Sequence, residues 1–524
     1  MKDDQISSNK IIDASISFAR MHCKEFTPQA RKNKGQFFTP KKVATFMADL
    51  FEIRNEKLQI LDPGAGTGIL LSAVCDRIFE QDISYNIQID AYENDESLIP
   101  FLKNTLELSN KKLSKKGHKL SFKIFNSNFI LEDKFSTNPN QPEITKKNQY
   151  DLVISNPPYY KIDINSPESR KLKDFVFGQP NIYSFFMISA MQLLKDEGQF
   201  IFIIPRSFCS GLYFGKIRDW FVKNTQIEFI HCFESRLKIF EDNVTQETVI
   251  FKGNKTKPDK KQSVKISISE DKSFTNSFSF MAKNKMVFER KSTESFIRIP
   301  HCEKDLKIIQ EIDTWDNSLK SLGMEISTGK VVDFRTKENL IYNFEGKNGV
   351  PLLWMHNLND GSIDWPSNKY SKPQGILLNE QTKHQVIPVD NYILLKRFTS
   401  KNQKRRLYAT PLLKSNFPEY SSIGLENHLN YIHGVKKPIS IFDLFGITAL
   451  FNTSFYDIYY RSFSGNTQVN ANEIRNISLP TSDKITAIGK LVENKKYKSN
   501  KDLDIHIGKI LNFNEALLEI VQNY

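Results

Sequence analysis

A regular alternation of strand-like and helix-like segments over the first 250 residues limits most strongly how this chain can fold. Seven short apolar runs are typical of buried strands: 57–61, 86–92, 120–125, 150–155, 199–204, 227–232 and 248–251. Four stretches with helical periodicity lie between them: 68–79, 98–108, 182–194 and 213–223. Strands that alternate with helices favour a largely parallel sheet covered by helices on both faces. We therefore expect an α/β fold for residues 1–251.

The alternation stops after residue 251, and two further regions follow. Residues 252–291 contain 11 Lys or Arg and 4 Asp or Glu, with few aliphatic residues. We expect a basic polar linker over 252–300, which could carry a hairpin. From 301 to 524 the chain has short aromatic-rich runs separated by Gly, Pro and Asn. This pattern predicts a second, irregular α+β domain, and 524 residues are enough for two or three domains.

The charge balance favours a polyanionic partner. The chain has 73 Lys and Arg against 60 Asp and Glu, a formal net charge of +13 at pH 7. Such a balance is typical of nucleic-acid binding, although a generally lysine-rich proteome would also give it. The cysteines have no CxxC pair, which argues against a disulfide framework or a zinc site: Cys23, Cys75, Cys209, Cys232 and Cys302. With no signal peptide and no membrane-spanning run, we expect a cytoplasmic protein without a bound metal.

A glycine-rich loop, DPGAGTG at Asp62–Gly68, connects the first strand to a helix. Its glycines, Gly64, Gly66 and Gly68, let the backbone turn tightly and approach a ligand at the start of that helix. The spacing GxGxG, rather than GxGxxG, favours a nucleoside over a dinucleotide. Glu93 ends the next strand, 25 residues after Gly68. A carboxylate at that place can accept hydrogen bonds from both ribose hydroxyls.

The stretch NPPY, Asn156–Tyr159, ends the strand predicted at 150–155. Pro157 and Pro158 stop the strand because neither has an N–H for the sheet ladder. The stiff turn directs the Asn156 side-chain oxygen and the Pro157 carbonyl toward one point, and Tyr159 adds a flat face. Two acceptors beside an aromatic ring predict a receptor for a planar group that carries an NH₂. Accepting both amine hydrogens favours the pyramidal nitrogen of a transition state, which is electrostatic preorganisation.

Four motifs in order carry a resemblance to a known family: GQFFTP (35–40), DPGAGTG (62–68), YENDESL (92–98) and SNPPY (155–159). They resemble the amino-methyltransferases that use S-adenosylmethionine. Their order is similar to that of the gamma-class N6-adenine DNA methyltransferases of type II restriction–modification systems, of the PstI/BsuBI kind. The segments 181–208 and 243–251 also fit this family's catalytic domain, and 327–335, 396–406 and 464–474 resemble its target-recognition region. The resemblance therefore covers most of the chain.

The resemblance implies a Rossmann-like methyltransferase fold with a C-terminal target-recognition domain. It also implies methyl transfer from S-adenosylmethionine to N6 of a flipped adenine in double-stranded DNA, which protects a specific site from a cognate restriction endonuclease. Thr39 is expected to contact the methionine part of the cofactor, beside the glycine loop. Glu93 is expected to bind the ribose. Asn128 and Phe129 stand where the family has an acid and an aromatic residue near the cofactor adenine, so the acid is absent here.

The resemblance also assigns the contacts to DNA. Tyr159 is expected to stack on the flipped base, and Phe240 stands near the place of a second stacking residue. The segment 396–406 has six basic residues and no acid: Lys396, Arg397, Lys401, Lys404, Arg405 and Arg406. They either contact phosphates and bases or form a solvated basic loop. The Asn- and Gln-rich segment 464–474 either contacts adenine edges or caps turns.

Three other interpretations remain open. A protein-glutamine or ribosomal-RNA adenine methyltransferase would use the same Asn-Pro-Pro-Tyr turn, because both substrates present a planar NH₂. A restriction nuclease is suggested by Pro258-Asp259 and by 289–291, which spell PD…ExK. About 50 residues are too few for a nuclease core, so we take the spelling as chance. A DNA-binding specificity module without activity is the third interpretation.

Overall fold

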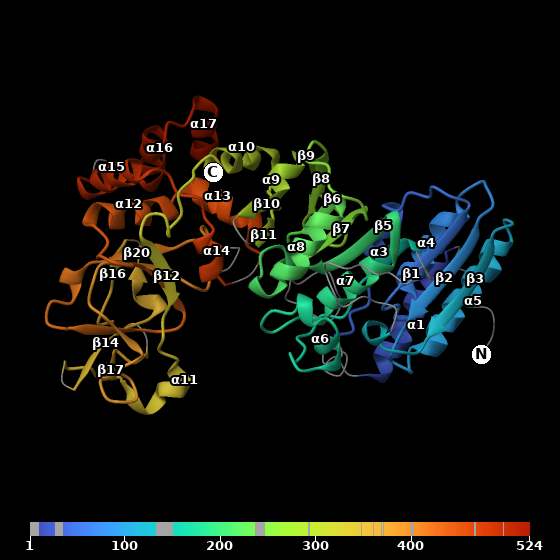
Figure 1. The fold of residues 1–524 in the computed structure, drawn as a ribbon, viewed down its shortest axis with the longest axis horizontal. Helices are drawn as coiled ribbons and strands as arrows, with labels where there is room; N and C mark the ends of the chain where they lie inside the picture. Colours follow the sequence, from blue (N-terminus) through green and yellow to red (C-terminus); the bar gives the residue numbers. More distant parts are fainter. Residues whose placement is uncertain are drawn as a thin grey trace. The chain divides into compact units, whose positions relative to one another are not determined.

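The computed structural model describes residues 10–26, 35–132, 150–235, 247–291, 294–346, 348–359, 361–367, 369, 371–399, 403–465, 468–495 and 497–524. The chain divides into two compact units, Met1–Ile299 and Pro300–Tyr524. Figure 1 colours the first unit from blue to light green and yellow and the second from yellow to red.

The first unit is built on a nine-stranded sheet. Its strands are β1 Lys57–Asp62, β2 Asn86–Tyr92, β3 Lys119–Phe125, β4 Tyr150–Ser155, β5 Leu194–Pro205, β6 Gln226–Phe233, β7 Thr248–Asn254, β8 Ser263–Ser269 and β9 Phe278–Lys283. They are arranged in the order β3-β2-β1-β4-β5-β7-β6-β8-β9 (Figure 1). The strands from β3 to β5 pair in parallel, whereas β7 runs antiparallel to both β5 and β6. The α/β fold predicted from the alternating pattern is confirmed.

The helices of the first unit cover the sheet in two groups. They are α1 Ile11–Glu25, α3 Lys41–Asp49, α4 Ile69–Phe79, α5 Ile99–Ser114, α6 Pro167–Lys171, α7 Ile182–Leu193 and α8 Gly215–Asn224. From β1 the chain moves outward through β2 to β3, and from β4 it moves the other way to β5. Crossovers between parallel strands are right-handed, so crossovers that move in opposite directions along the sheet place their helices on opposite faces. Helices α4 and α5 therefore lie on one face and α7 lies on the other. Helices α1 and α3 pack against α4, and α8 packs against α7.

The structure differs from the predicted linker over 252–300. Strand β7 continues to Asn254, β8 pairs in parallel with β6, and β9 pairs antiparallel with β8. A short helix, α9 Asn284–Val287, and the pair β10 Phe288–Lys291 and β11 Glu294–Ile297 complete the first unit. In β8, Val264 and Ile266 are buried while Lys265 between them is exposed. The hairpin that the linker could carry is present as β8 and β9, but it belongs to the central sheet. A strand with lysine on its outer face has the composition of a polar linker, which explains the difference.

The second unit combines two small sheets with a group of helices. One sheet has the order β12-β22-β19-β20, formed by Met324–Thr328, Leu429–Gly434, Tyr392–Lys396 and Ala409–Leu412. The other has the order β13-β17-β14-β21-β18, formed by Leu340–Ile341, Gly375–Leu377, Gly349–Leu353, Ser422–Leu425 and Val386–Pro388. A small pair, β15 Leu358–Asn359 and β16 Ser362–Ile363, forms a separate ladder that packs against β20. The predicted α+β character is confirmed.

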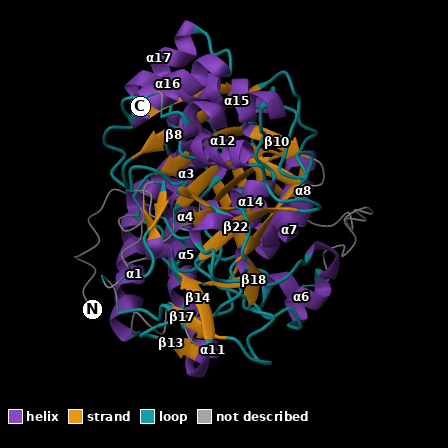
Figure 2. Cartoon of the chain, turned by 90° about the vertical axis from the view of Figure 1, so that its left-hand side faces the viewer, coloured by secondary structure: helices purple, strands orange, loops and turns teal. Residues whose placement is uncertain are grey.

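The second unit has eight helices among its described residues: α10 Glu303–Ile312, α11 Asp333–Thr336, α12 Ile441–Phe451, α13 Ser454–Phe463, α14 Ala471–Arg475, α15 Ser482–Glu493, α16 Asn500–Ile510 and α17 Glu515–Asn523. Most of them gather at one end of the unit, whereas the short α11 lies near β14 and β17 (Figure 1). Figures 1 and 2 both show α12, α15, α16 and α17 together, with β14 and β17 at the opposite end of this unit. One hydrophobic cluster joins these helices to the four-stranded sheet and includes Ile309, Ile432 and Ile447. Over the described residues, every helix is too short or too polar to cross a membrane.

Candidate active site

Four neighbouring parallel strands, β3, β2, β1 and β4, end at the same edge of the central sheet. Strand β1 lies between β2 and β4, where the direction of winding reverses. In open α/β sheets a ligand binds in the crevice at this switch point. A cavity of about 420 Å³ lies there. Residues at or just after three of these strands line it: Asp62 at β1, Glu93 after β2 and Asn156 after β4.

The glycine loop turns back on itself at the cavity. Gly66 and Gly68 have φ angles of 55° and 83°, in the left-handed region that side chains disfavour. A Cβ added at Gly68 would lie 3.0 Å from Thr105 and 3.1 Å from Leu102, so helix α5 leaves no room for a side chain there. Gly68 immediately precedes α4, whose first N–H groups are those that favour an anionic or polar ligand. The glycines thus form a tight turn at a helix start, and their approach to a ligand stays a prediction.

Two buried carboxyl groups face the cavity. The Glu93 side chain accepts hydrogen bonds from the backbone N–H of Gly66 and of Asp95, both at 2.9 Å. Asp62 accepts from the Gly64 N–H at 3.2 Å. Burial raises the pKa of Glu93, and burial together with the nearby Glu93 raises the pKa of Asp62 to about 7. Because each oxygen of Glu93 can accept more than one bond, the carboxylate still has acceptor capacity for a ligand.

Asn156 has a fixed orientation at the end of β4. Its Nδ2 donates to the Phe37 carbonyl at 2.8 Å and to Thr39 Oγ1 at 3.0 Å. Both amide hydrogens are thereby directed to the segment 35–40, which leaves Oδ1 on the other side of the amide. Thr39, which the resemblance places at the cofactor, contacts Asn156 and also lines the cavity. The two motifs GQFFTP and SNPPY are therefore joined through side-chain hydrogen bonds.

The Tyr159 ring is packed inside the first unit. Its side chain is only 8% exposed, and its ring contacts Phe37 and Tyr183, with both pairs of centroids 6.0 Å apart. From the NPPY turn and the next residue, Asn156, Pro158 and Tyr160 line the cavity. Burial raises the pKa of the Tyr159 hydroxyl well above its usual value, so this group stays a neutral donor. The flat face predicted for stacking is covered by protein in this structure.

Comparisons with known proteins agree with this geometry. Residues 54–240 match the family described as Eco57I restriction-modification methylase. Over 487 residues the chain is 36% identical to the type II methyltransferase M.BsuBI of Bacillus subtilis, a match that covers 92% of this chain and 95% of that protein. The chain belongs to the type II methyltransferases of restriction–modification systems. The family predicted from the motif order is confirmed.

Two further comparisons extend over nearly the whole of this type II methyltransferase. It is 32% identical over 504 residues to the type II methyltransferase M.PstI of Providencia stuartii, covering 95% of this chain and 96% of that one. Among solved structures, the type IIL restriction-modification enzyme MmeI in complex with DNA matches with a TM-score of 0.53 at 13% identity. That match covers 98% of this chain and 73% of MmeI, and it shows a shared fold.

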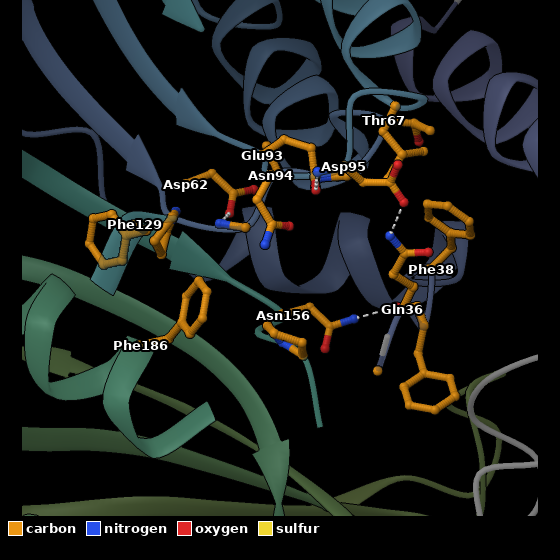
Figure 3. Close-up of a pocket in the computed structure, with 18 of the residues that line it drawn as sticks. Gln36, Phe38, Asp62, Thr67, Glu93, Asn94, Asp95, Phe129, Asn156 and Phe186 are labelled. Atoms are coloured by element: carbon orange, nitrogen blue, oxygen red, sulfur yellow. Dashed lines mark hydrogen bonds between the residues drawn. The ribbon is translucent and has the colours of Figure 1, made fainter. Parts of the chain in front are cut away.

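In this methyltransferase the Asn128 amide is used within the protein. Its Oδ1 accepts from the Ile130 N–H at 3.1 Å, and its Nδ2 donates to Glu168 at 2.8 Å. Phe129 lines the cavity together with Phe186, at a centroid distance of 5.8 Å, and Figure 3 shows both rings at one end of it. Phe186 was missed as a site residue, although it lies in the segment 181–208 that resembles the family. No sequence signal pointed to Glu168.

The opposite end of the cavity contains a polar pair that was also missed. Gln36 Nε2 donates to Asp95 Oδ2 at 2.7 Å, next to Phe38 (Figure 3). Both residues lie within motifs quoted for the resemblance, GQFFTP and YENDESL. Their pairing depends on two loops that are 59 residues apart in the chain, and a single sequence gives no sign of it.

The residues of this methyltransferase that were predicted to contact DNA lie in different environments. Lys404 is exposed, Lys396 and Arg405 line a second cavity in the second unit, and Arg397 donates through Nη1 to the Asn427 carbonyl at 2.9 Å. The structure contradicts the prediction for Arg406, whose side chain is 1% exposed. It lies over the Tyr460 ring and donates to Ser464 Oγ at 3.3 Å, so it has no surface for DNA. Two further predicted residues lie outside the described part of the chain: Lys401 and Phe240.

Proposed function

We propose that this protein is a site-specific DNA methyltransferase that transfers a methyl group from S-adenosylmethionine to N6 of an adenine in a particular duplex sequence, and so protects that sequence from a cognate restriction endonuclease. The observation that carries this proposal is the fixed amide of Asn156 at the edge of the cavity. Both of its N–H groups are occupied by Phe37 and Thr39, so Oδ1 is the atom that can accept from a substrate. Oδ1 already accepts from the Tyr159 hydroxyl at 2.7 Å, and a carbonyl oxygen can accept a second bond. Membership of the type II methyltransferase family supports DNA as the substrate.

The residues around the cavity fit S-adenosylmethionine. Glu93 has acceptor capacity for the two ribose hydroxyls and is already held by two backbone N–H groups. Phe129 and Phe186 offer apolar faces for the adenine ring, and Thr39, Asp62 and the glycine loop surround the remaining space. Any contact of Asn128 with the cofactor adenine would come from the backbone of its segment, since its side chain already binds Ile130 and Glu168. When bound, S-adenosylmethionine supplies an electrophilic methyl group.

Asn156 and Pro157 would orient the target amine. The exocyclic nitrogen of adenine is a poor nucleophile because its lone pair is delocalised into the ring. Acceptors that take both amine hydrogens stabilise the pyramidal nitrogen on which that lone pair is localised. The Asn156 Oδ1 atom cannot reach an amine within a stacked duplex, so the base must leave the helix to enter the site. Reading of the target sequence is assigned to the second unit, which contains the basic residues Lys396, Arg397, Lys404 and Arg405.

Protein glutamine and other exocyclic amines would satisfy the same two acceptors. The match over nearly the full length to type II methyltransferases favours DNA over a protein substrate. The experiment that decides is methylation by the purified protein with isotope-labelled S-adenosylmethionine, offered plasmid DNA or bacterial protein extract. After digestion of the DNA to nucleosides, mass spectrometry should find N6-methyladenine, with and without EDTA. Label in protein but not in DNA, or N4-methylcytosine in place of N6-methyladenine, would overturn the proposal.

A further inference from the structure

Four segments of the second unit that lie apart in the sequence meet at one place, which we call the recognition junction: residues 329–331, 397–398, 427–428 and 468–469. The Asn427 N–H donates to the Val331 carbonyl at 2.9 Å. The Arg397 N–H donates to the His428 carbonyl at 2.9 Å, and the Val469 N–H donates to the Arg397 carbonyl at 2.7 Å. The junction therefore joins all three C-terminal stretches quoted for the family, and it adds a fourth, the loop at Asn427 and His428, which the sequence did not indicate.

His428 is held rigidly at the centre of this junction. Its Nδ1 lies 2.5 Å from Oε1 of Glu426, and its backbone N–H donates to the other oxygen of the same carboxyl group at 3.0 Å. The Glu426 side chain is 1% exposed, whereas the His428 side chain is 46% exposed. The imidazole ring also packs on Phe398, with centroids 4.7 Å apart. One edge of the ring is thus fixed inside the protein, and Nε2, on the opposite edge, has no hydrogen-bond partner among the residues that the structure describes.

The neighbouring side chains of the junction have the functional groups that read base edges. Asn427 and Gln468 have amides, which can bond bidentately to adenine, and Lys330 has an ammonium group, which can bond to guanine. In the described part of the chain, no hydrogen bond or ion pair engages these three side chains. The Arg397 side chain joins this set through its bond to the Asn427 backbone carbonyl. Polar groups without internal partners, on segments that meet at one rigid imidazole, are what an interface with base edges requires.

We propose that His428, oriented by the buried carboxyl group of Glu426, reads a base edge of the target DNA and determines one position of the recognition sequence. This inference rests on the proposed function and deepens it. A contact that only attracts phosphate needs no fixed geometry, as exposed lysines show. Discrimination between bases needs a donor or acceptor held at a set place, and Glu426 and Phe398 provide this for Nε2. Glu426 is accordingly a positioning residue, and His428 the residue that touches DNA.

The test is the methylation pattern of genomic DNA in a host that lacks adenine methylation, where every genomic sequence is offered to the protein at once. Wild type, His428→Ala, His428→Asn and Glu426→Gln are expressed and the methylated positions are sequenced. We expect one defined motif for wild type. Both His428 variants should methylate a motif that is degenerate at one position, with discrimination there reduced about 10- to 100-fold. Glu426→Gln should relax the same position by a smaller factor.

His506→Ala is the matched control, because His506 on α16 is also a part-exposed histidine paired with an acid, Asp502, at 3.2 Å. It should leave the motif unchanged. An unaltered motif in both His428 variants would overturn the inference, as would a uniform loss of methylation at every position, which is the behaviour of a phosphate contact. If His428→Ala does not fold, His428→Asn, which keeps a polar side chain, decides. Absence of any adenine methylation by wild type would instead refute the proposed function.

Discussion

The hydroxyl of Tyr159 donates a hydrogen bond at 2.7 Å to Oδ1 of Asn156, the atom that the proposed reaction needs as an acceptor for the substrate amine. The same hydroxyl lies 2.8 Å from the Ile203 carbonyl. A phenol has one proton, so it can donate fully to only one of these acceptors at a time. When an amine approaches Asn156, the Tyr159 proton can turn to the Ile203 carbonyl and stay bonded. The arrangement thus keeps Oδ1 satisfied in the free protein and can release it to the substrate.

Two substitutions at Tyr159 should distinguish the contribution of its hydroxyl from that of its ring. In Tyr159→Phe the Asn156 oxygen and the Ile203 carbonyl lose a shared donor, so the free energy of unfolding should fall by about 1–3 kcal/mol while kcat falls less than about tenfold. Tyr159→Ala removes a packed ring and should cost about 3–5 kcal/mol of stability. Denaturant titration and steady-state kinetics measure both effects. Full stability of Tyr159→Ala would contradict the packing described here and would favour an exposed ring that only stacks on the base.

The Asn156 amide should matter for turnover far more than for binding. Asn156→Ala removes one preorganised acceptor, and by analogy with oxyanion-hole deletions kcat should fall by about 10²–10³. The affinity for cofactor, measured by calorimetry, should change little, because Glu93 and the glycine loop are untouched. Asn165→Ala is a suitable control, since Asn165 is exposed in the loop after the NPPY turn. Normal turnover by Asn156→Ala would mean that the turn has only a structural role.

The raised pKa of Asp62 predicts a dependence of stability on pH. Its carboxyl group is buried, and its pKa is about 7 in the folded protein against 3.8 for an ordinary aspartate. Between these values the folded state binds more protons than the unfolded state, so stability should fall as pH rises from about 4 to about 7. The loss from this one group should be at most about 4 kcal/mol.

Asp62→Asn should remove that dependence, which thermal or denaturant unfolding at several pH values would reveal as a difference from wild type. The exposed Asp82 provides a control, and Asp82→Asn should follow the wild-type curve. A parallel pH profile for Asp62→Asn and wild type would show that the Asp62 carboxyl group does not titrate in this range. The comparison reports Asp62 together with its interaction with Glu93, because the other carboxyl groups are common to both proteins.

Two basic residues in the same short segment should behave in opposite ways. Lys404 is exposed, so Lys404→Ala should weaken DNA binding uniformly and reduce the slope of log K against log salt by about 1. Arg406 is buried against Tyr460 and Ser464, so Arg406→Ala should destabilise the second unit by about 3–5 kcal/mol. Fluorescence anisotropy at several salt concentrations and thermal unfolding distinguish the two. A stable Arg406→Ala with weakened DNA binding would return Arg406 to the DNA contacts.

Local patterns in the sequence were enough for the frame of the site. Apolar runs that stop at glycine or proline marked the ends of β1 and β4, and the parallel sheet expected from the strand–helix alternation places such ends at one edge. Asp62, Glu93 and Asn156 could therefore be assigned to one site from their positions in the chain, and the structure gathers them around one cavity. The order of the motifs was enough to identify the family. The fold brings the same motifs together around the cavity.

What each side chain faces was decided only by the tertiary structure. Tyr159 is turned inward by a carbonyl 44 residues away, and Arg406 is buried by a helix more than 50 residues away. Over 252–300 the sequence left a hairpin open but did not indicate that β8 and β9 extend the central sheet, because one face of an edge hairpin is as polar as a linker. The pairing of His428 with Glu426 is local in sequence, but its place beside Arg397 and Gln468 depends on strands that meet only after folding. Hydrophobic periodicity specifies which face of an element is buried, whereas the partner across that face is set by packing between distant segments, which one sequence does not encode locally.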